Sequence, residues 1–194
     1  MHDRRFNPAS AHKLEDPQRL VWLPPDAIVA ALEVQPGDVV ADIGAGTGYF
    51  ALPLARAIGP SGHLFAVDAQ QEMLSLLRQK LDSAPMPNIE PVHAEADRTS
   101  LPDHACSLVF LANIWHEFDD RGAVLRETMR ILRPGGRIAI LDWRTDVEPV
   151  AGPPLAHRIA DADAQNELRR AGFAPLPSTA LWPSSWLVQG VRPQ

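Results

Sequence analysis

The chain has 194 residues, a net charge of −6, 45 % hydrophobic and 22 % charged residues, a composition typical of one soluble globular domain. The acidic excess repels phosphate backbones and a single cysteine excludes an internal disulfide or a multi-thiolate site, so neither nucleic acid nor a metal ion is expected. No run of about 18 apolar residues and no apolar signal region are present, which predicts no membrane span and a cytoplasmic location.

Short apolar strands then alternate with helices whose apolar residues recur at helical spacing. Prolines at 24 and 25 precede a short helix predicted at 26–32, so we expect residues 1–35 to form an N-terminal helical cover segment before the main domain at 36–194. In the first half of that domain the pattern predicts strands at 39–43, 63–67, 89–93 and 108–111 and helices at 50–58 and 73–81.

The second half continues this alternation and ends in two neighbouring strands. Residues 144–158 form a long loop with several prolines, which is unusual in a compact domain and indicates a lid or binding loop. The whole pattern predicts the α/β class, with a parallel sheet covered on both faces. We expect, in order, a helix from Asp119 or Asp120 to 132, a strand at 138–141, a helix from Asp161 or Asp163 to Gly172, and an antiparallel hairpin of 173–181 and 185–191.

A glycine-rich loop follows the first predicted strand. Gly44, Gly46 and Gly48 alternate with other residues, which lets the backbone turn sharply and approach a ligand beside the free N–H groups of the next helix. A dinucleotide-binding loop has the spacing G-x-G-x-x-G. Here the third glycine comes one residue early and Tyr49 stands where that motif needs glycine, so an NAD-dependent oxidoreductase is a weaker alternative.

Five ordered segments together resemble the class I S-adenosylmethionine-dependent methyltransferases. They are the glycine loop at 42–48, Val67-Asp68, Glu95-Ala96-Asp97, the segment at 113–117 and the turn at 132–136. Within that family, residues 12–19, 42–50, 115–117 and 152–154 are most similar to small bacterial enzymes of the ubiquinone/menaquinone-biosynthesis type, close to methyltransferase types 11 and 25.

The resemblance implies a single Rossmann-like, doubly wound, seven-stranded sheet in the order 3-2-1-4-5-7-6, with strand 7 antiparallel. The prolines agree with this order. Pro91 falls in the predicted third strand, and Pro175 and Pro177 fall in the sixth. Both are edge strands, which tolerate proline because one side has no partner.

The resemblance also implies which residues bind S-adenosylmethionine. Asp68 would accept the ribose hydroxyls, or else cap the following helix. Either Glu95 or Asp97 would meet adenine, and Met73 is either an adenine platform or a core residue. The implied cofactor-binding residues are Asp42, Gly44, Ala45, Gly46, Gly48, Asp68, Ala69, Met73, Glu95, Ala96, Asp97 and Asn113.

His116 follows the fourth strand, at the sheet edge where ligands bind in open α/β folds. It is a candidate general base, or else a histidine that holds the loop by a hydrogen bond. Asp16 and Arg19, with His12, precede the core and would fold over the cofactor as a cover or remain a solvated surface segment. The candidate substrate-binding residues are His12, Trp115, Trp143, Arg144 and His157.

The expected function is therefore an S-adenosylmethionine-dependent methyltransferase that acts on a small-molecule acceptor as a monomer or homodimer. The protein would mainly align the donor with the acceptor and exclude water. A non-catalytic protein that binds S-adenosylmethionine or S-adenosylhomocysteine is the first alternative, and the oxidoreductase is the second.

Overall fold

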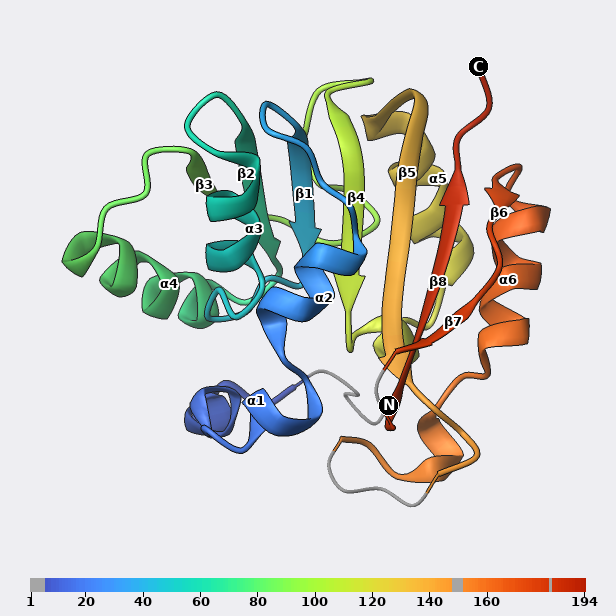
Figure 1. Ribbon diagram of the computed structural model, residues 1–194, viewed down its shortest axis with the longest axis horizontal. Helices are drawn as coiled ribbons and strands as arrows, with labels where there is room; N and C mark the ends of the chain where they lie inside the picture. Colours follow the sequence, from blue (N-terminus) through green and yellow to red (C-terminus); the bar gives the residue numbers. More distant parts are fainter. Residues whose placement is uncertain (1–5, 148–151, 182) are drawn as a thin grey trace.

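The computed structural model describes residues 6–147, 152–181 and 183–194. Its strands are β1 (Val39–Ile43), β2 (His63–Asp68), β3 (Ile89–His93), β4 (Cys106–Ala112), β5 (Leu132–Trp143), β6 (Ala174–Pro175), β7 (Thr179–Leu181) and β8 (Ser185–Val191). They form one sheet in the order β3-β2-β1-β4-β5-β8-β6, with β7 also paired to β8 (Figure 1). β1 to β5 are parallel and β8 is antiparallel to β5, so the predicted α/β class and strand order are confirmed.

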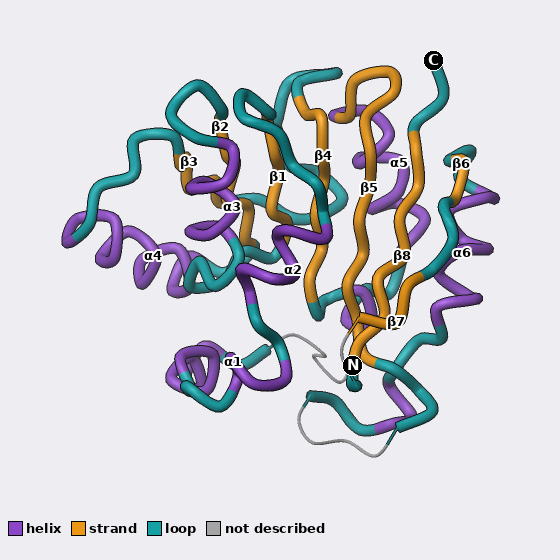
Figure 2. The backbone as a smooth tube through the Cα atoms, viewed as in Figure 1, coloured by secondary structure: helices purple, strands orange, loops and turns teal. Residues whose placement is uncertain are grey.

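Helices cover both faces of the sheet (Figure 2). They are η1 (Pro8–Glu15), α1 (Arg19–Trp22), α2 (Pro25–Ala31), α3 (Ala51–Ile58), α4 (Gln71–Ser83), η2 (Trp115–Glu117), α5 (Arg121–Ile131), η3 (Leu155–His157) and α6 (Asp161–Arg170). One core layer packs α2, α3 and α4 against the sheet, and the other packs α5 and α6. In β4, Phe110 enters the first layer and Val109 enters the second, because successive strand residues point to opposite faces.

Two predicted element boundaries are wrong. The expected strand at 173–181 is divided into β6 and β7, both paired with β8, and Pro177 lies in the break because it has no N–H to donate. Pro91 and Pro175 do lie in edge strands. The last parallel strand begins at Leu132 rather than 138, because Leu132 is already extended and pairs with Cys106.

The N-terminal segment and the 152–158 segment both lie beside the carboxyl ends of the parallel strands (Figure 1). Within the predicted cover segment, η1 and α1 lie across this edge, whereas α2 packs Ile28 and Val29 into the core. Residues 1–5 of that segment and 148–151 of the predicted lid loop lie outside the described residues. In the described ranges, every helix is too short or too polar to cross a membrane.

Candidate functional site

A cleft of about 1440 Å³ opens at the carboxyl ends of β1, β2 and β4, where ligands bind in open α/β sheets. Its walls also include η1, α1 and residues 152–153, which are distant in sequence. Two predicted cofactor residues, Asp42 and Gly48, do not line it. The predicted cofactor residues that do line it are Gly44, Ala45, Gly46, Asp68, Ala69, Met73, Glu95, Ala96, Asp97 and Asn113.

Two glycines of the loop after β1 have different surroundings. A Cβ added to Gly46 would have its nearest neighbour, a Leu14 methyl carbon, 3.7 Å away, so this part of the loop is open to a ligand. A Cβ on Gly48 would come within 2.6 Å of Leu77 on α4. Gly46 therefore provides the close approach to the cleft, and Gly48 allows the loop to pack on α4.

Two acids lie at the ends of β1 and β2. Asp68 accepts the N–H groups of Gly46 and Gln70, each at 2.8 Å, and so ties the glycine loop to the start of α4. Asp42 is buried, and its Oδ2 has no hydrogen-bond partner among the described residues. Burial and the charge of Asp68 raise the pKa of Asp42 to about 7. Asp42 thus acts on the cleft through its charge rather than by lining it.

Asn113 follows β4 in a left-handed conformation with φ of 57°. Its N–H donates to the carbonyl of Leu141 at 2.7 Å, while its buried Oδ1 has no partner in the described part of the chain. Met73 is 2 % exposed and lines the cleft without belonging to either core layer. Asn113 therefore has an amide oxygen that the described fold does not use, whereas Met73 is a buried residue of α4 that also lines the cleft.

His116 and Asp142 form a buried pair at the ends of β4 and β5. Nδ1 of His116 lies 2.9 Å from Oδ1 of Asp142, and the His116 backbone N–H donates to Oδ2 at 3.0 Å. Asp142 also accepts the backbone N–H of Trp143 at 2.8 Å. Burial lowers the pKa of His116, but the hydrogen bond to Asp142 and its charge outweigh burial and raise that pKa above its ordinary value.

Carboxylates concentrate around this part of the cleft. Glu117 lines the cleft, and burial raises its pKa to about 7 despite the opposing charge of His116. Asp142 and Asp68 raise this pKa further, just as Asp68 raises that of Asp42. Asp68 acts on both Asp42 and Glu117, so a positively charged ligand beside these three acids would favour their ionised forms.

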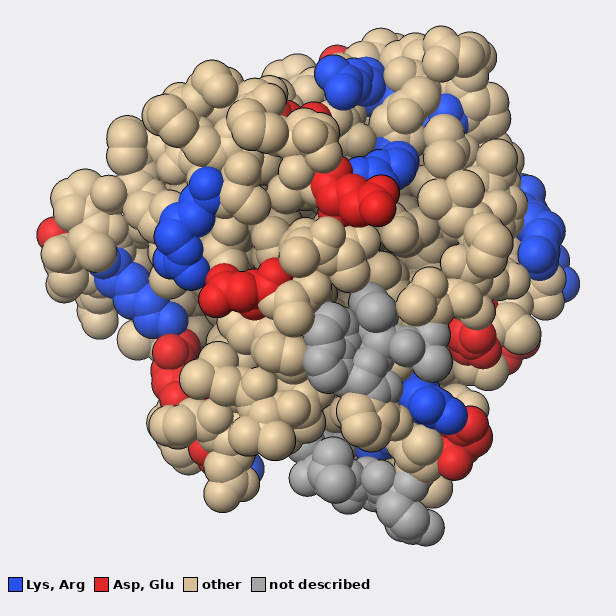
Figure 3. Space-filling model, in the orientation of Figure 1, with Lys and Arg blue, Asp and Glu red and all other residues tan. Residues whose placement is uncertain are grey.

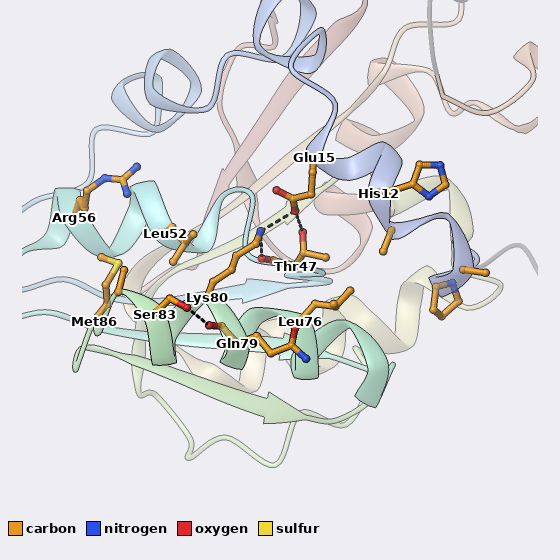
Figure 4. A pocket seen from close by; sticks show the side chains of 14 residues that line it. His12, Glu15, Thr47, Leu52, Arg56, Leu76, Gln79, Lys80, Ser83 and Met86 are labelled. Carbon is orange, nitrogen blue, oxygen red and sulfur yellow. Dashed lines mark hydrogen bonds and ion pairs between the residues drawn. The ribbon is translucent and has the colours of Figure 1, made fainter.

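The N-terminal cover is tied to the loop after β1 and to α4 by side-chain contacts (Figure 4). Glu15 accepts the Thr47 hydroxyl at 2.5 Å and pairs with Lys80 at 2.7 Å. Lys80 also donates to the Thr47 carbonyl at 2.8 Å. Further along the cover, the guanidinium of Arg19 lies 4.0 Å from the centre of the Tyr49 ring. These contacts close the cover over the cofactor side of the cleft.

A second, smaller cavity of about 740 Å³ lies between η1, α3 and α4. His12 lines this cavity rather than the cleft, so it is not brought to the other predicted substrate residues. Acidic and basic side chains are interspersed on the face drawn in Figure 3, so charge of one sign does not mark a further binding surface on its described part.

Aromatic rings form part of the wall of the cleft. The Trp22 and Trp143 ring centres are 5.2 Å apart, and both residues line the cleft. The Arg158 guanidinium lies 5.4 Å from the Trp143 ring centre, and Gly152 packs directly on the same ring. Trp143 is therefore the predicted substrate residue that the structure places at the cleft.

The other predicted substrate residues lie outside the cleft. Trp115 is fully buried in the core, where its indole N–H donates to Glu167 at 3.0 Å. Arg144 pairs with Asp146 at 2.7 Å, and His157 is exposed on η3. The polar groups of Trp115 and Arg144 therefore have partners within the fold and do not need a ligand.

Asp142 and Trp22 belong to the site but were not predicted as site residues from the sequence. Asp142 had a usable signal, because it follows the apolar run of a parallel strand directly and therefore lies at the ligand-binding edge. No sequence signal indicated Trp22, since its place at the cleft depends on how the N-terminal segment folds back.

Comparison with known proteins gives the same family as the geometry. Residues 40–136 of the 194 match the family described as "Methyltransferase domain". The chain is 34 % identical over 111 residues to the demethylmenaquinone methyltransferase of Listeria welshimeri, covering 57 % of this chain and 47 % of that protein. It is 36 % identical over 118 residues to the ubiquinone/menaquinone biosynthesis C-methyltransferase of Hahella chejuensis, with 60 % and 47 % covered. The chain thus spans about half the length of the curated relatives it matches.

Solved structures extend this likeness to nearly the whole chain. A SAM-dependent methyltransferase from Aquifex aeolicus has a TM-score of 0.91 and 27 % identity, covering 96 % of this chain and 99 % of that one. The phosphoethanolamine N-methyltransferase 2 of Haemonchus contortus, in complex with S-adenosyl-L-methionine, has a TM-score of 0.76 at 12 % identity, covering 89 % and 53 %. At that identity the second likeness concerns the fold alone.

The residues present fit S-adenosylmethionine on structural grounds. The backbone is open at Gly46, the buried Oδ1 of Asn113 has no partner in the described ranges, and acids surround the place where a cationic ligand would lie. Together with the family match, these features identify the cofactor. The chain belongs to the methyltransferase domain family, as a class I S-adenosylmethionine-dependent methyltransferase.

Proposed function

We propose that this chain transfers the methyl group of S-adenosylmethionine to a small acceptor of quinone type that carries a ring hydroxyl. The names of the relatives from Listeria and Hahella support this acceptor class. The observation that carries the proposal is that His116 and the Trp22–Trp143 wall line the same cleft as Gly46. One cavity therefore holds both a place for the donor and a place for a planar acceptor.

The electrostatics of the cleft support a cationic donor. Bound S-adenosylmethionine supplies an electrophilic methyl group on a positively charged sulfur, beside a charged amino group. Asp42, Asp68 and Glu117 offer compensating negative charge. The same acids would repel the pyrophosphate of NAD, which disfavours the oxidoreductase.

The chain contributes alignment and exclusion of water. Holding the acceptor in line with the donor can lower the barrier by ~7–11 kcal/mol. Trp22, whose ring packs against the buried Trp143, would hold a planar ring by stacking, and the cover tied through Glu15 would exclude solvent. Nε2 of His116 would take the proton of the ring hydroxyl, because Nδ1 is already bonded to Asp142.

A non-catalytic binding protein remains the second candidate function. The fold alone hosts other chemistry, since the [4+2]-cyclase SpnF has a TM-score of 0.75 with this chain at 16 % identity. The Trp22–Trp143 wall favours catalysis, because a protein that only bound the cofactor would need neither the ring pair nor a histidine in the same cleft.

The test is the release of S-adenosylhomocysteine. Purified protein is incubated with S-adenosylmethionine and a panel of hydroxylated aromatic and quinol compounds, and mass spectrometry follows both products. We expect S-adenosylhomocysteine in equal amount to one methylated, ring-bearing product. Tight cofactor binding without turnover on this panel or on a metabolite extract would favour the binding protein instead.

A further inference from the structure

We propose that Asp142 is a positioning residue that holds the proton of His116 on Nδ1 and leaves Nε2 as the proton acceptor. The catalytic role of Nε2 rests on the proposed function, whereas the location of the proton on Nδ1 does not. Asp142 is 1 % exposed and receives N–H groups from the His116 backbone, the His116 ring and the Trp143 backbone, at 2.8 to 3.0 Å. The two backbone N–H groups can only donate, so both carboxylate oxygens of Asp142 act as acceptors.

The hydrogen bonds determine which ring nitrogen carries the proton. Because the Asp142 carboxylate has nothing to donate, Nδ1 of His116 must be the donor in their contact. A neutral ring then has its lone pair on Nε2. Among the described residues Nε2 has no hydrogen-bond partner, and His116 lines the cleft. The free lone pair is therefore available to a ligand.

The same carboxylate also fixes where the ring lies. It binds both the backbone and the side chain of His116, so η2 cannot rotate without losing both contacts. The end of β5 is itself fixed beside β4 by the pairing of Ala112 with Leu141 and by the Asn113 N–H on the Leu141 carbonyl. Asp142 thus holds the imidazole in a fixed position relative to the sheet.

Charges around the ring favour this role. Asp142 and Glu117 raise the pKa of His116, whereas burial and Arg158 lower it. In the reaction the acceptor O–H bond breaks, its proton goes to Nε2, and the neighbouring ring carbon bonds to the methyl carbon as the carbon–sulfur bond breaks. The C–H proton of that ring carbon then moves to the oxygen and restores the ring hydroxyl. The resulting imidazolium is stabilised by Asp142 and later returns its proton to water. Activity should therefore decline on the acid side of the His116 pKa.

The test is a ¹⁵N NMR titration of histidine-labelled protein, which needs no acceptor. The His116 signals are assigned with His116→Gln. We expect a protonated Nδ1 and an unprotonated Nε2 at high pH, with a pKa above that of free histidine. A wild-type ring protonated on Nε2 would overturn the proposal even if Asp142→Asn does not fold, and the expected tautomer without any turnover would contradict the proposed function alone.

Asp142→Asn supplies the second measurement. Its amide can donate to Nδ1 and so moves the proton to Nε2, which removes the base. We expect the His116 pKa to fall and the single-turnover rate to drop by ~10²–10⁴, with cofactor affinity within about twofold. Glu127→Gln makes the same change in a buried acid that binds Thr99 and Arg130 instead, and should lose stability without moving the pH profile. If Asp142→Asn keeps the wild-type rate and pH profile, Asp142 only ties η2 to β5.

Discussion

The two ends of the cleft are built in different ways. At the cofactor end, Gly46, Asp68 and Asn113 each follow a parallel strand closely, so the sheet ladder positions them. At the acceptor end, Trp22 and Trp143 are more than 100 residues apart in the chain and meet through ring contact. The cofactor end is therefore positioned by the backbone of the sheet, whereas the Trp22–Trp143 wall is positioned by side-chain packing.

The largest expected effect is on the methyl-transfer rate and comes from a substitution at the acceptor end alone. His116→Ala should reduce the single-turnover rate by ~10²–10⁴ and leave cofactor affinity within about twofold, because it removes the base but none of the loop after β1. Single-turnover measurement at saturating cofactor separates chemistry from binding. His63→Ala, on an exposed histidine paired with Glu90, is the matched control. A rate within threefold of wild type would remove His116 from the catalytic group.

The second-largest expected effect is on cofactor affinity and comes from a substitution at the cofactor end. Gly46→Val should weaken S-adenosylhomocysteine binding by at least about 100-fold, which is ~2.7 kcal/mol, because the side chain enters the ligand's space. Gly59→Val is the control, since Gly59 also has a left-handed φ, of 69°, but nothing lies within 4 Å of its added Cβ. Both variants suffer backbone strain, so equal losses of affinity by calorimetry would contradict a ligand contact at Gly46.

A smaller effect separates the two roles of Asp68. Asp68→Ala should weaken cofactor binding by roughly 1.5–3 kcal/mol, the scale of hydrogen bonds to a charged group. Part of this loss comes from the glycine loop, which Asp68 holds through the Gly46 N–H. Calorimetry measures the affinity and thermal denaturation measures the stability. Unchanged affinity with lowered stability would mean that Asp68 serves the fold alone.

The smallest effect concerns the cover. Glu15→Gln weakens the ties to Thr47 and Lys80, and partly exposed ion pairs contribute only ~0.2–1 kcal/mol. We therefore expect S-adenosylhomocysteine to dissociate about two- to fivefold faster, measured by stopped-flow fluorescence. Glu33→Gln, on an exposed turn after α2, should leave the dissociation rate unchanged. An unchanged rate in Glu15→Gln would mean that these contacts do not hold the cover closed.

The difference between the two ends also explains what the sequence could predict. Strands and the residues that follow them are local patterns, so Gly46, Asp68 and Asn113 could be located along the chain, whereas the strand order and the roles of these residues toward the cofactor came from the family resemblance. Trp22 could not, because nothing local indicates that the N-terminal segment returns to the sheet edge. Among the wrong boundaries, Pro177 divides an edge strand that its apolar neighbours predicted to be continuous.

His116 was placed correctly beside the fourth strand, but its partner was not recognised. An acid at the end of β5 meets the segment after β4 only because those strands are neighbours, which is information about topology rather than spacing. Trp115 and Arg144 illustrate the opposite case. Both have residue types common at substrate sites, yet Glu167 and Asp146 satisfy them away from the cleft.

Calorimetric titration with S-adenosylmethionine, S-adenosylhomocysteine and NAD tests the central claim, that the acidic cleft at the sheet edge binds a cationic methyl donor. Both adenosyl ligands should bind, and either at 100 times its dissociation constant should stabilise the fold by ~2.7 kcal/mol. NAD should give no heat of binding, because its pyrophosphate would face Asp68 and Glu117, which line the cleft. Tight binding of NAD with no response to S-adenosylhomocysteine would contradict the claim.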